Sequence, residues 1–460
     1  MKPDLNDFSQ FFFIGVAGSG MSALAQFLAG SGKIVSGSDR YFGKGVADEI
    51  QLKLEKERIA CFPQDGSGIH ENLSLVVVST AIEETIPEMQ KVRQLGIPVM
   101  KRSEVLAMIA RSRKTIAIGG TSGKSTTSAM LFGILEKAGL APGIISGAGL
   151  IALINKGKIG NAEVGTGEWL VIEADESDGS IVQYEPEIGV LLNIDKDHQD
   201  IPELMQIFGT FKNNTRQRFS VNRSNALAAS LSSGIDNDFS VNGEPAGFMA
   251  GHFSQDGFQT KFQINGHTFQ MGSLGKHNME NAVAAVSVAA MLGVSFEDCA
   301  IALADYEGIY RRHQLIGKHN GIFLIDDYAH NPVKCAASIR ACQPLAPKVV
   351  AWFQPHGYGP TRFLKNDFIE EISNALRSGD EIWFSEIFYA GGTAVKDISA
   401  KELADAIAAK GKRAFFVENR DHFFKAVKSH LSHPAVLLLM GARDPSLEKF
   451  ASQIWQKLQA

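Results

Sequence analysis

A glycine-rich segment that carries a lysine and several hydroxyl groups is the part of this chain best suited to chemistry. Its residues are Gly120, Thr121, Ser122, Gly123, Lys124, Ser125 and Thr126. Backbone N–H groups in such a turn point at an anion, and a helix that begins there adds its positive end. A lysine placed like Lys124 reaches the outer phosphates of a nucleotide, and a hydroxyl placed like Ser125 holds Mg²⁺. The segment therefore predicts binding of ATP and Mg²⁺.

The neighbours of this segment match a strand–turn–helix unit. The apolar run 115–118 predicts a buried strand, and 128–136 predicts the helix that follows. The strict P-loop pattern requires glycine where this chain has Ile118, so only the shorter form is present. The alternative is an ordinary glycine-rich turn in which the lysine occurs by chance.

Acidic side chains follow two other predicted strands. The strand at 170–174 runs into Glu173-Ala-Asp-Glu-Ser-Asp178, and the strand at 188–193 leads to Asp195 and His198. A carboxylate at a strand end that faces a phosphate loop can hold Mg²⁺. We therefore expect Ser125, Glu173 and His198 to be metal ligands. The alternatives are a solvated acidic loop and a hydrogen-bonded structural histidine.

The first hundred residues open with a second glycine-rich turn. A predicted strand at 11–16 leads into Gly15-Val-Ala-Gly-Ser-Gly-Met21, and a further strand at 33–39 ends at Asp39. An acid about 20 residues beyond such glycines is typical of dinucleotide and UDP-sugar sites. The spacing departs from G-x-G-x-x-G at Ala17, so a plain tight turn is the alternative.

The rest of the chain alternates predicted strands and helices. We expect an antiparallel β segment at 217–271 and a helix at 282–290 that begins after Gly275-Lys-His-Asn-Met-Glu-Asn281. Polar residues at a helix start are also ordinary caps. Beyond Tyr310-Arg-Arg-His313, a doubly wound α/β domain is predicted. Its strands are expected at 322–325, 348–353, 381–384 and 435–440, and its helices at 367–376 and 400–409.

Composition narrows the class of protein. A chain of 460 residues is too long to fold around a single hydrophobic core, and its length indicates about three domains. A net charge of −5 without a basic run argues against nucleic acid as a partner. Four scattered cysteines suit a reducing compartment, and the apolar run 11–16 is too short for a membrane helix. We expect a cytoplasmic protein that does not bind membranes, and the oligomeric state stays open.

Six motifs, in this order, resemble the signatures of the Mur ligase family of peptidoglycan synthesis. They are Gly120-Thr-Ser-Gly-Lys-Ser125, Glu173-Ala-Asp-Glu-Ser-Asp178, Asn193-Ile-x-x-Asp197-His198, His277-Asn278-x-x-Asn281, Arg311-Arg312 and Asp327-Tyr-Ala-His-Asn-Pro332. The resemblance extends over essentially the whole chain. Within the family, the first glycine turn, the acidic block and Phe353-Gln-Pro-His356 are most similar to the branch that joins L-alanine to UDP-N-acetylmuramate.

The resemblance implies an α/β fold of three domains. These would be a Rossmann-like UDP-sugar domain at 1–113, a P-loop ATPase domain with a parallel central sheet at 114–313, and a Rossmann-like amino-acid domain at 314–460. The implied reaction uses ATP to convert the muramyl carboxylate into an acyl phosphate. The amine of the amino acid then attacks it, which gives an amide, ADP and phosphate.

The resemblance also implies roles for individual residues. The implied catalytic residues are Lys124, Glu173, His198 and His330. Additional ATP contacts would come from His277, Asn278, Asn281, Arg312 and Asp327. The UDP-sugar would contact Gly15, Gly18, Ser19, Gly20, Met21, Ser38 and Asp39. Several relatives use a carbamoylated lysine, and Lys212 lies near the expected place in the sequence.

The expected acceptor site departs from the family pattern. Relatives that add alanine follow Gln-Pro-His with Arg-x-x-Arg-x-Arg, whereas this chain has Gly357 and Pro360 at the first two arginine positions. His356 and Arg362 remain as acceptor-binding candidates, and Arg443 is a possible substitute. Glycine and proline cannot replace a bidentate arginine–carboxylate contact. The acceptor is therefore L-alanine held differently, another amino acid, or a short peptide recycled onto UDP-N-acetylmuramate. A non-catalytic protein that binds UDP-sugar and ATP is the alternative from another class.

Overall fold

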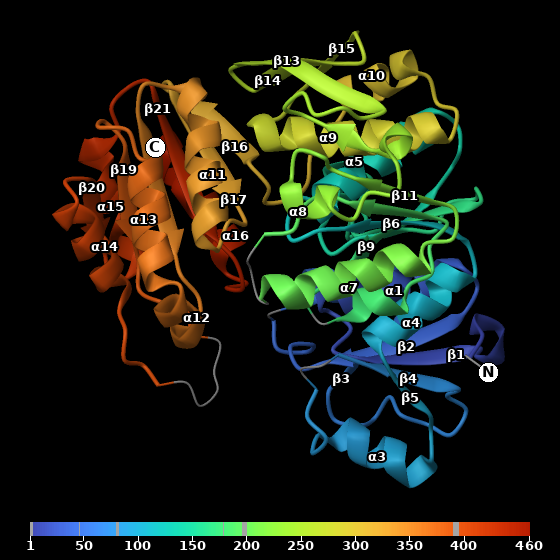
Figure 1. Ribbon diagram of the computed structural model, residues 1–460. Helices are drawn as coiled ribbons and strands as arrows, with labels where there is room; N and C mark the ends of the chain where they lie inside the picture. Colours follow the sequence, from blue (N-terminus) through green and yellow to red (C-terminus); the bar gives the residue numbers. More distant parts are fainter. Residues whose placement is uncertain (1–2, 46, 80–81, 178, 196–199, 390–394) are drawn as a thin grey trace. The chain divides into compact units, whose positions relative to one another are not determined.

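The computed structural model describes residues 3–45, 47–79, 82–177, 179–195, 200–389 and 395–460. The chain divides into two compact units (Figure 1). Unit 1 contains Met1–His252, Phe262–Met271 and His277–Ile309. Unit 2 contains Phe253–Lys261, Gly272–Lys276 and Tyr310–Ala460.

Unit 1 begins with a parallel sheet of five strands. Across the sheet the order is β3 (Ala60–Pro63), β2 (Ile34–Asp39), β1 (Gln10–Ile14), β4 (Leu75–Val78) and β5 (Val99–Lys101). Its helices are α1 (Ser19–Gly30), α2 (Asp48–Lys56), α3 (Pro87–Leu95) and α4 (Arg102–Arg111). The strand order reverses at β1, which is where doubly wound sheets bind ligands. The first glycine turn follows β1 directly and therefore lies at this switch point.

A second, mostly parallel sheet of six strands carries the phosphate loop. Its order is β11 (Arg218–Val221), β10 (Ile188–Leu191), β6 (Lys114–Gly119), β9 (Trp169–Ala174), β7 (Gly143–Ile145) and β8 (Ala162–Glu163). Only the β7–β8 pair is antiparallel among the described pairs. The helices of this part are α5 (Lys124–Lys137), α6 (Ile151–Ile154), α7 (Ile201–Asn214), α8 (Ala226–Ala229), α9 (Lys276–Met291) and α10 (Phe296–Ala304).

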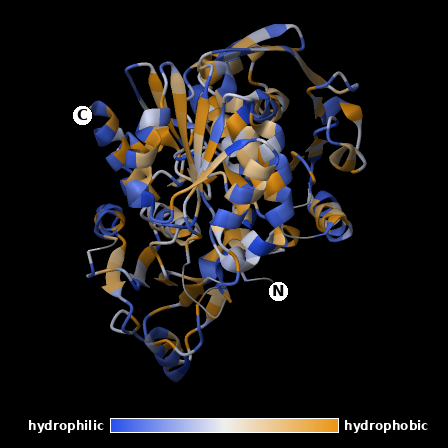
Figure 2. Ribbon diagram, turned by 90° about the vertical axis from the view of Figure 1, so that its left-hand side faces the viewer, coloured by the Kyte–Doolittle hydropathy of each residue, from blue (hydrophilic) through white to orange (hydrophobic). Residues whose placement is uncertain are grey.

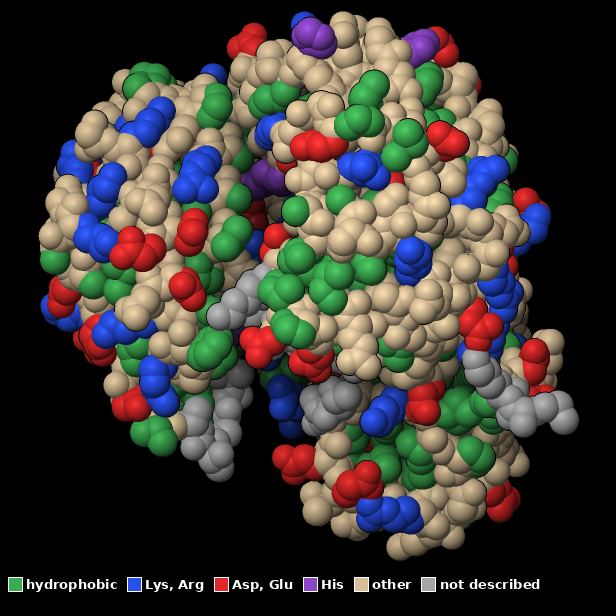
Figure 3. Space-filling view, viewed as in Figure 1, with side chains coloured by type: hydrophobic (Ala, Val, Ile, Leu, Met, Phe, Trp, Pro, Cys, Tyr) green, Lys and Arg blue, Asp and Glu red, His purple; other side chains and the backbone are tan. Residues whose placement is uncertain are grey.

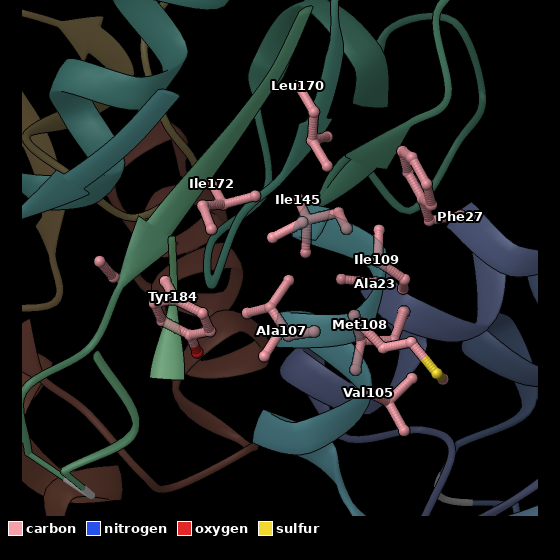
Figure 4. Close-up of a cluster of buried hydrophobic side chains, with 14 of the residues drawn as sticks. Ala23, Phe27, Val105, Ala107, Met108, Ile109, Ile145, Leu170, Ile172 and Tyr184 are labelled. Atoms are coloured by element: carbon pink, nitrogen blue, oxygen red, sulfur yellow. The ribbon is translucent and has the colours of Figure 1, made fainter. Parts of the chain in front are cut away.

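One hydrophobic cluster joins the two sheets of unit 1 (Figure 4). Helix α4 lies at its centre: Val105, Met108 and Ile109 are buried together with Phe27 of α1. Strands β7 and β9 contribute Ile145, Leu170 and Ile172 to the same cluster. Burial of this apolar surface fixes α4 between the two sheets. The residue that begins α4 is therefore held rigidly relative to both glycine turns.

The expectation of an antiparallel segment at 217–271 is wrong in two places. Strand β11 pairs in parallel with β10, and β12 (Phe239–Ser240) pairs in parallel with β13 (Phe248–Asp256). In β11, consecutive residues 219–221 are all buried, which is typical of a covered parallel strand and not of an alternating one. The smaller sheet is completed by β14 (Gln259–Ile264) and β15 (His267–Met271), which follow β13 in the order.

Unit 2 is built on one six-stranded sheet. Its order is β16 (Gln314–His319), β17 (Ile322–Asp327), β21 (Ala435–Gly441), β18 (Val349–Gln354), β19 (Glu381–Phe384) and β20 (Arg413–Phe416). Its helices are α11 (Pro332–Cys342), α12 (Tyr358–Phe363), α13 (Lys365–Ala375), α14 (Ala400–Ala409), α15 (Phe423–Val427) and α16 (Leu447–Gln459). Apart from antiparallel β16, the described pairs are parallel. Figure 2 shows strands rich in hydrophobic residues and helices with a hydrophilic side.

These sheets confirm the predicted α/β fold class. Every strand predicted by number from the sequence has a counterpart within a few residues, although β3, β7, β8, β16 and β20 were not predicted. The four cysteines are free thiols, and three of them are buried. Figure 3 shows acidic and basic side chains interspersed over the face that it presents. Among the described helices, none has the length and apolarity to cross a membrane.

Candidate active site

The phosphate loop has the backbone that its glycines predict. Strand β6 ends at Gly119, and α5 begins at Lys124 with Gly123 as its N-cap in the left-handed region, at φ 86°. A Cβ atom on Gly123 would lie 2.3 Å from Asn281 Oδ1. Glycine is therefore required here both for the dihedral angle and for the space. The free N–H groups of the first turn of α5 remain available to an anion.

Lys124 is held by two acids of the segment that follows β9. Its Nζ donates to Glu176 Oε2 at 2.6 Å and to the Gly120 carbonyl at 2.7 Å, and it lies 3.7 Å from Asp175 Oδ1. The Lys124 and Glu176 side chains are 15% and 6% exposed. Burial disfavours the charged ammonium, but the carboxylates of Glu176 and Asp175 outweigh it and raise the pKa of Lys124. Lys124 thus remains a cation beside the loop.

Glu173 lies beside the hydroxyl group predicted to share a metal ion with it. Its Oε2 accepts from Ser125 Oγ at 2.8 Å, and its Oε1 accepts from Ser146 Oγ at 2.6 Å and from the Gly147 N–H at 2.7 Å. Carboxylate and hydroxyl oxygens are the donors that Mg²⁺ prefers, so this set fits the ion. The sequence did not single out Ser146, because no recognisable motif surrounds it.

Asn193 clamps the phosphate loop. Its Oδ1 accepts from Thr121 Oγ1 at 2.8 Å and from the Ser122 N–H at 2.9 Å, while its Nδ2 donates to the Ser122 carbonyl at 3.1 Å. This residue was part of a predicted motif without an assigned role. The second predicted metal ligand, His198, lies outside the described residues. Among the described residues, no group of three His, Cys, Asp or Glu side chains has the arrangement of a metal site.

Helix α9 brings its polar residues to the back of the loop. Thr127 Oγ1 donates to Asn281 Oδ1 at 3.3 Å, and Asn281 Nδ2 donates to Asn278 Oδ1 at 3.3 Å. Both asparagines are buried, whereas His277 is half-buried. In this arrangement the Asn281 side chain lies against Gly123 and leaves no room for a Cβ atom there.

The first glycine turn is tied to the end of β2. The Gly15 N–H donates to the Ser38 carbonyl at 2.7 Å, and the Ala17 N–H donates to Asp39 Oδ2 at 3.2 Å. Asp39 Oδ1 also accepts from the Tyr41 N–H at 3.1 Å. The turn ends at Gly18, the N-cap of α1, so Ser19, Gly20 and Met21 form its first turn. This places the predicted UDP-sugar residues together around one helix N-terminus.

Unit 2 carries a second cluster of predicted site residues at the end of β17. Asp327 accepts from the Ala329 N–H at 2.9 Å and from Ser338 Oγ at 3.0 Å, and His313 Nε2 lies 3.1 Å from it. Burial opposes ionisation, but His313 and Arg312 outweigh it and hold the pKa of Asp327 below its usual range. The Arg312 guanidinium lies over the Tyr328 ring, 5.1 Å from its centroid.

His330 and His356 lie together in unit 2, with ring centroids 5.7 Å apart. His330 Nδ1 lies 2.9 Å from the Tyr328 carbonyl. Burial, together with the nearby cation Lys334, lowers the pKa of His330 to about 3. The ring is therefore neutral at physiological pH, which suits a hydrogen-bonding role and not that of a proton-carrying cation.

The titration of His330 gives a direct prediction. Its folded-state pKa lies below the unfolded value of 6.5, so protonation favours the unfolded chain. The stability supplied by the neutral ring is present above that value and is lost as the pH falls toward about 3. We expect the NMR signals of the His330 ring, assigned by their loss in His330→Gln, to stay constant from pH 8 to pH 5. A midpoint near 6.5 would contradict this environment.

The predicted acceptor residues lie around α12. Gly357 is its N-cap at φ 73°, a dihedral angle that favours glycine, and the Pro360 ring approaches it closely. The Arg362 guanidinium pairs with Asp397 and also donates to the Val395 carbonyl at 3.3 Å. The arginine that the sequence retains is thus engaged by a surface carboxylate.

The predicted site residues therefore fall into two groups. Unit 1 contains the phosphate loop, Glu173, the α9 asparagines and the first glycine turn. Unit 2 contains Arg312, Asp327, His330, His356 and Arg362. Lys212, the carbamoylation candidate, donates to the Ser232 carbonyl at 3.2 Å on unit 1. Sequence reasoning missed Glu176 as a lysine partner because the acidic block offered four carboxylates at similar spacing.

Comparison with known proteins places this geometry in one family. Three family models match in succession: the Mur ligase catalytic domain at 10–114, the Mur ligase middle domain at 118–289 and the Mur ligase glutamate ligase domain at 311–443. The UDP-N-acetylmuramate–L-alanine ligase of Carboxydothermus hydrogenoformans is 34% identical over 94% of this chain and 93% of its own. The UDP-N-acetylmuramate–L-alanine ligase of Synechococcus sp. strain RCC307 is 35% identical over 97% of this chain and 95% of its own.

Solved structures agree in fold. The UDP-N-acetylmuramate-alanine ligase of Thermotoga maritima superposes with a TM-score of 0.81 over 98% of this chain and 99% of its own, at 24% identity. A murein peptide ligase from Psychrobacter arcticus superposes with a TM-score of 0.68 over 98% of both chains, at 21% identity. The three matched segments and the near-complete coverage by relatives of more than 30% identity show that the chain belongs to the Mur ligase family.

Proposed function

We propose that this protein is an ATP-dependent ligase that joins L-alanine to UDP-N-acetylmuramate in peptidoglycan synthesis, with Mg²⁺ as its metal ion. The observation that carries the proposal is the joint placement of Lys124 and the Ser125–Glu173 pair at one glycine-rich loop. Phosphoryl transfer needs a fixed cation and a metal-binding oxygen pair beside the phosphates. The curated relatives described above carry out, by their names, the ligation of L-alanine to this sugar nucleotide.

In the proposed first step, a carboxylate oxygen of the muramyl group attacks the γ-phosphorus of ATP, and ADP leaves. The loop N–H groups and Lys124 Nζ would stabilise the charge on the transferring phosphoryl group. Ser125 and Glu173 would hold Mg²⁺, which would neutralise phosphate charge there. To reach a phosphate of ATP, Lys124 would break its ion pair with Glu176. After the products leave, the ion pair with this buried carboxylate would form again.

In the second step, the amine of the acceptor attacks the acyl phosphate and loses a proton, and phosphate leaves with the oxygen that came from the carboxylate. We propose His330 and His356 as groups that contact the acceptor or the reacting carbonyl. In the neutral His330 ring, Nδ1 carries the proton and donates to the Tyr328 carbonyl, so Nε2 can accept a hydrogen bond from an amine. Arg312, Asp327, His277 and Asn278 are proposed to contact ATP, and His198 to hold metal, as the family motifs imply.

We also propose that the three matched segments correspond to domains at 1–113, 114–313 and 314–460, with the UDP-sugar at the first glycine turn. Support comes from the separate sheets and from the reversal of strand order at β1. A reaction that consumes ATP and a chain with four free thiols both suit a cytoplasmic location.

The acceptor gives the proposal a specific test. If Arg362 takes the carboxylate of L-alanine, it has to leave Asp397 first. The two side chains are 49% and 46% exposed, so their pair is weak. Asp397→Asn is expected to lower KM for L-alanine by roughly 1.5- to 5-fold, and Arg362→Ala to raise it. Asp405→Asn removes a comparable surface pair with Lys401 and serves as the control that leaves KM unchanged.

The test of the function itself is ADP formation that depends on both substrates. Purified protein with ATP, Mg²⁺ and UDP-N-acetylmuramate should release ADP when L-alanine is added. Release only with a tripeptide would favour the recycling alternative, for which the absence of arginine at Gly357 and Pro360 is the motivating observation. Binding of ATP and UDP-sugar without turnover for any acceptor would contradict the ligase proposal and favour a regulatory role.

A further inference from the structure

Arg102, the first residue of α4, lies between the two glycine turns of unit 1. A Cβ atom on Gly20, in the first turn of α1, would lie 3.0 Å from Arg102 Cδ and 3.2 Å from its Nη1. The guanidinium therefore lies against the N-terminus of α1. Helix α4 also contacts β6, the strand that leads into the phosphate loop. The Arg102 side chain thus lies at the proposed UDP-sugar turn, on a helix that packs against the strand of the phosphate loop.

Arg102 lies where the partial charges of two helices disfavour a cation. A helix N-terminus carries partial positive charge, so cations are disfavoured there and anions are favoured. Arg102 is at the N-terminus of its own helix and also beside that of α1. The cation and the two helix ends together create a positive region that an anion would stabilise.

The packing of α4 fixes this region. Beginning three residues after Arg102, the side chains of Val105 to Ile109 are buried in the cluster that α1, β7 and β9 share. Gly20 leaves the room that the guanidinium occupies, because any larger side chain would meet it. Under the proposed function, the sugar nucleotide extends from the first glycine turn toward the phosphate loop and so passes Arg102.

We propose that Arg102 binds an anionic group of the UDP-sugar, its diphosphate or its carboxylate, and orients the substrate toward Lys124. The inference rests on the proposed function, and it adds a residue that none of the motifs contains. Arginine suits the task because its planar fork can bind two oxygens of a carboxylate or a phosphate at once. Lysine at this position would keep the charge and lose the paired geometry.

Titration calorimetry with three ligands tests the proposal and separates the two anions. UDP-N-acetylmuramate carries diphosphate and carboxylate, whereas UDP-N-acetylglucosamine carries only the diphosphate. Arg102→Ala is expected to weaken binding of UDP-N-acetylmuramate by at least about tenfold, with Arg102→Lys in between. ATP binding should change by less than about threefold. Equal loss for both sugar nucleotides identifies the diphosphate as the partner, and loss for the muramate alone identifies the carboxylate.

Two further variants keep the test independent of folding. Arg111→Ala, at the other end of α4, removes an arginine whose guanidinium donates to the Pro3 carbonyl at 3.3 Å, and this variant should bind substrate normally. Gly20→Ala should displace the guanidinium without straining a helical backbone, and it should weaken binding much less in the Arg102→Ala background than in the native one. Equal effects of Gly20→Ala in both backgrounds would overturn the proposed coupling.

The outcomes for the two proposals are distinguishable. If the native protein binds no UDP-N-acetylmuramate, the proposed function itself fails. If the native protein binds it and Arg102→Ala binds it equally well, only the role of Arg102 is overturned.

Discussion

Replacing Lys124 by methionine is expected to lower substrate-dependent ADP formation by roughly 10²–10³-fold. The substitution keeps the length of the side chain but removes the cation that would stabilise the transferring phosphoryl group. Methionine also leaves Glu176 buried without its ammonium partner. Initial rates at saturating ATP, UDP-N-acetylmuramate and L-alanine measure the loss. Activity within about threefold of native would contradict the catalytic role of Lys124.

The same variant makes a prediction about stability and pH. Burial already raises the pKa of Glu176, and removal of Lys124 takes away the charge that opposed this rise. A carboxyl whose folded-state pKa exceeds its unfolded value of 4.5 destabilises the protein above that value when it ionises. The stability deficit of Lys124→Met should therefore shrink as the pH falls toward 4.5, as followed by thermal unfolding.

A double variant separates stability from catalysis. Lys124→Met with Glu176→Gln removes both charges of the buried pair, and such replacements cost far less than loss of one partner. We expect this double variant to unfold nearer to the native temperature and still to lack activity. Recovery of activity together with stability would show that the lysine acts only through folding.

Replacing Gly123 by alanine is expected to abolish ATP binding, with at least a hundredfold loss of affinity. The new Cβ atom would meet Asn281 Oδ1 at 2.3 Å, and φ 86° costs a non-glycine residue about 1–2 kcal/mol. The loop can relieve the clash and the strained dihedral angle only by moving the N–H groups that form the phosphate cradle. A shift of about 1 Å in groups that position a substrate lowers their effect by about 10²-fold. Calorimetric titration with ATP measures the effect.

Gly133→Ala is the matched control for this prediction. Gly133 lies in the same helix, α5, and a Cβ atom there would have nothing within 4 Å. Alanine in a helix interior is about 0.5–1 kcal/mol more favourable than glycine, so this variant should bind ATP normally and unfold at the same or a higher temperature. Normal ATP binding by Gly123→Ala would mean that the loop adopts another conformation with nucleotide.

The sequence predicted those parts of the fold that have strong local signals. Apolar runs such as Val349–Gln354 and the capped helix Ala400–Ala409 appear close to their expected bounds. Weakly patterned segments were predicted less well, because β11 and β12 depend on parallel partners that a local pattern does not identify. Short edge elements such as β20 carry too few buried residues to stand out.

The site was predictable where residue type and backbone act together. The spacing of glycine and lysine located the phosphate loop. The structure then places the two predicted metal ligands together, with Ser125 Oγ 2.8 Å from Glu173 Oε2. Contacts between segments far apart in sequence were not predictable: Asn193 reaches Ser122 across 71 residues, and Arg102 approaches Gly20 across 82 residues, the difference between their numbers. Such pairs depend on the packing of whole elements.

The central claim is that ATP activates the carboxylate of UDP-N-acetylmuramate for attack by L-alanine. The most direct measurement uses sugar nucleotide labelled with ¹⁸O in that carboxylate, followed by mass spectrometry of the products. We expect UDP-N-acetylmuramoyl-L-alanine, ADP and phosphate that carries one ¹⁸O atom, because the phosphate leaves with a carboxylate oxygen. Unlabelled phosphate, or ADP released without an amide product, would contradict the claim.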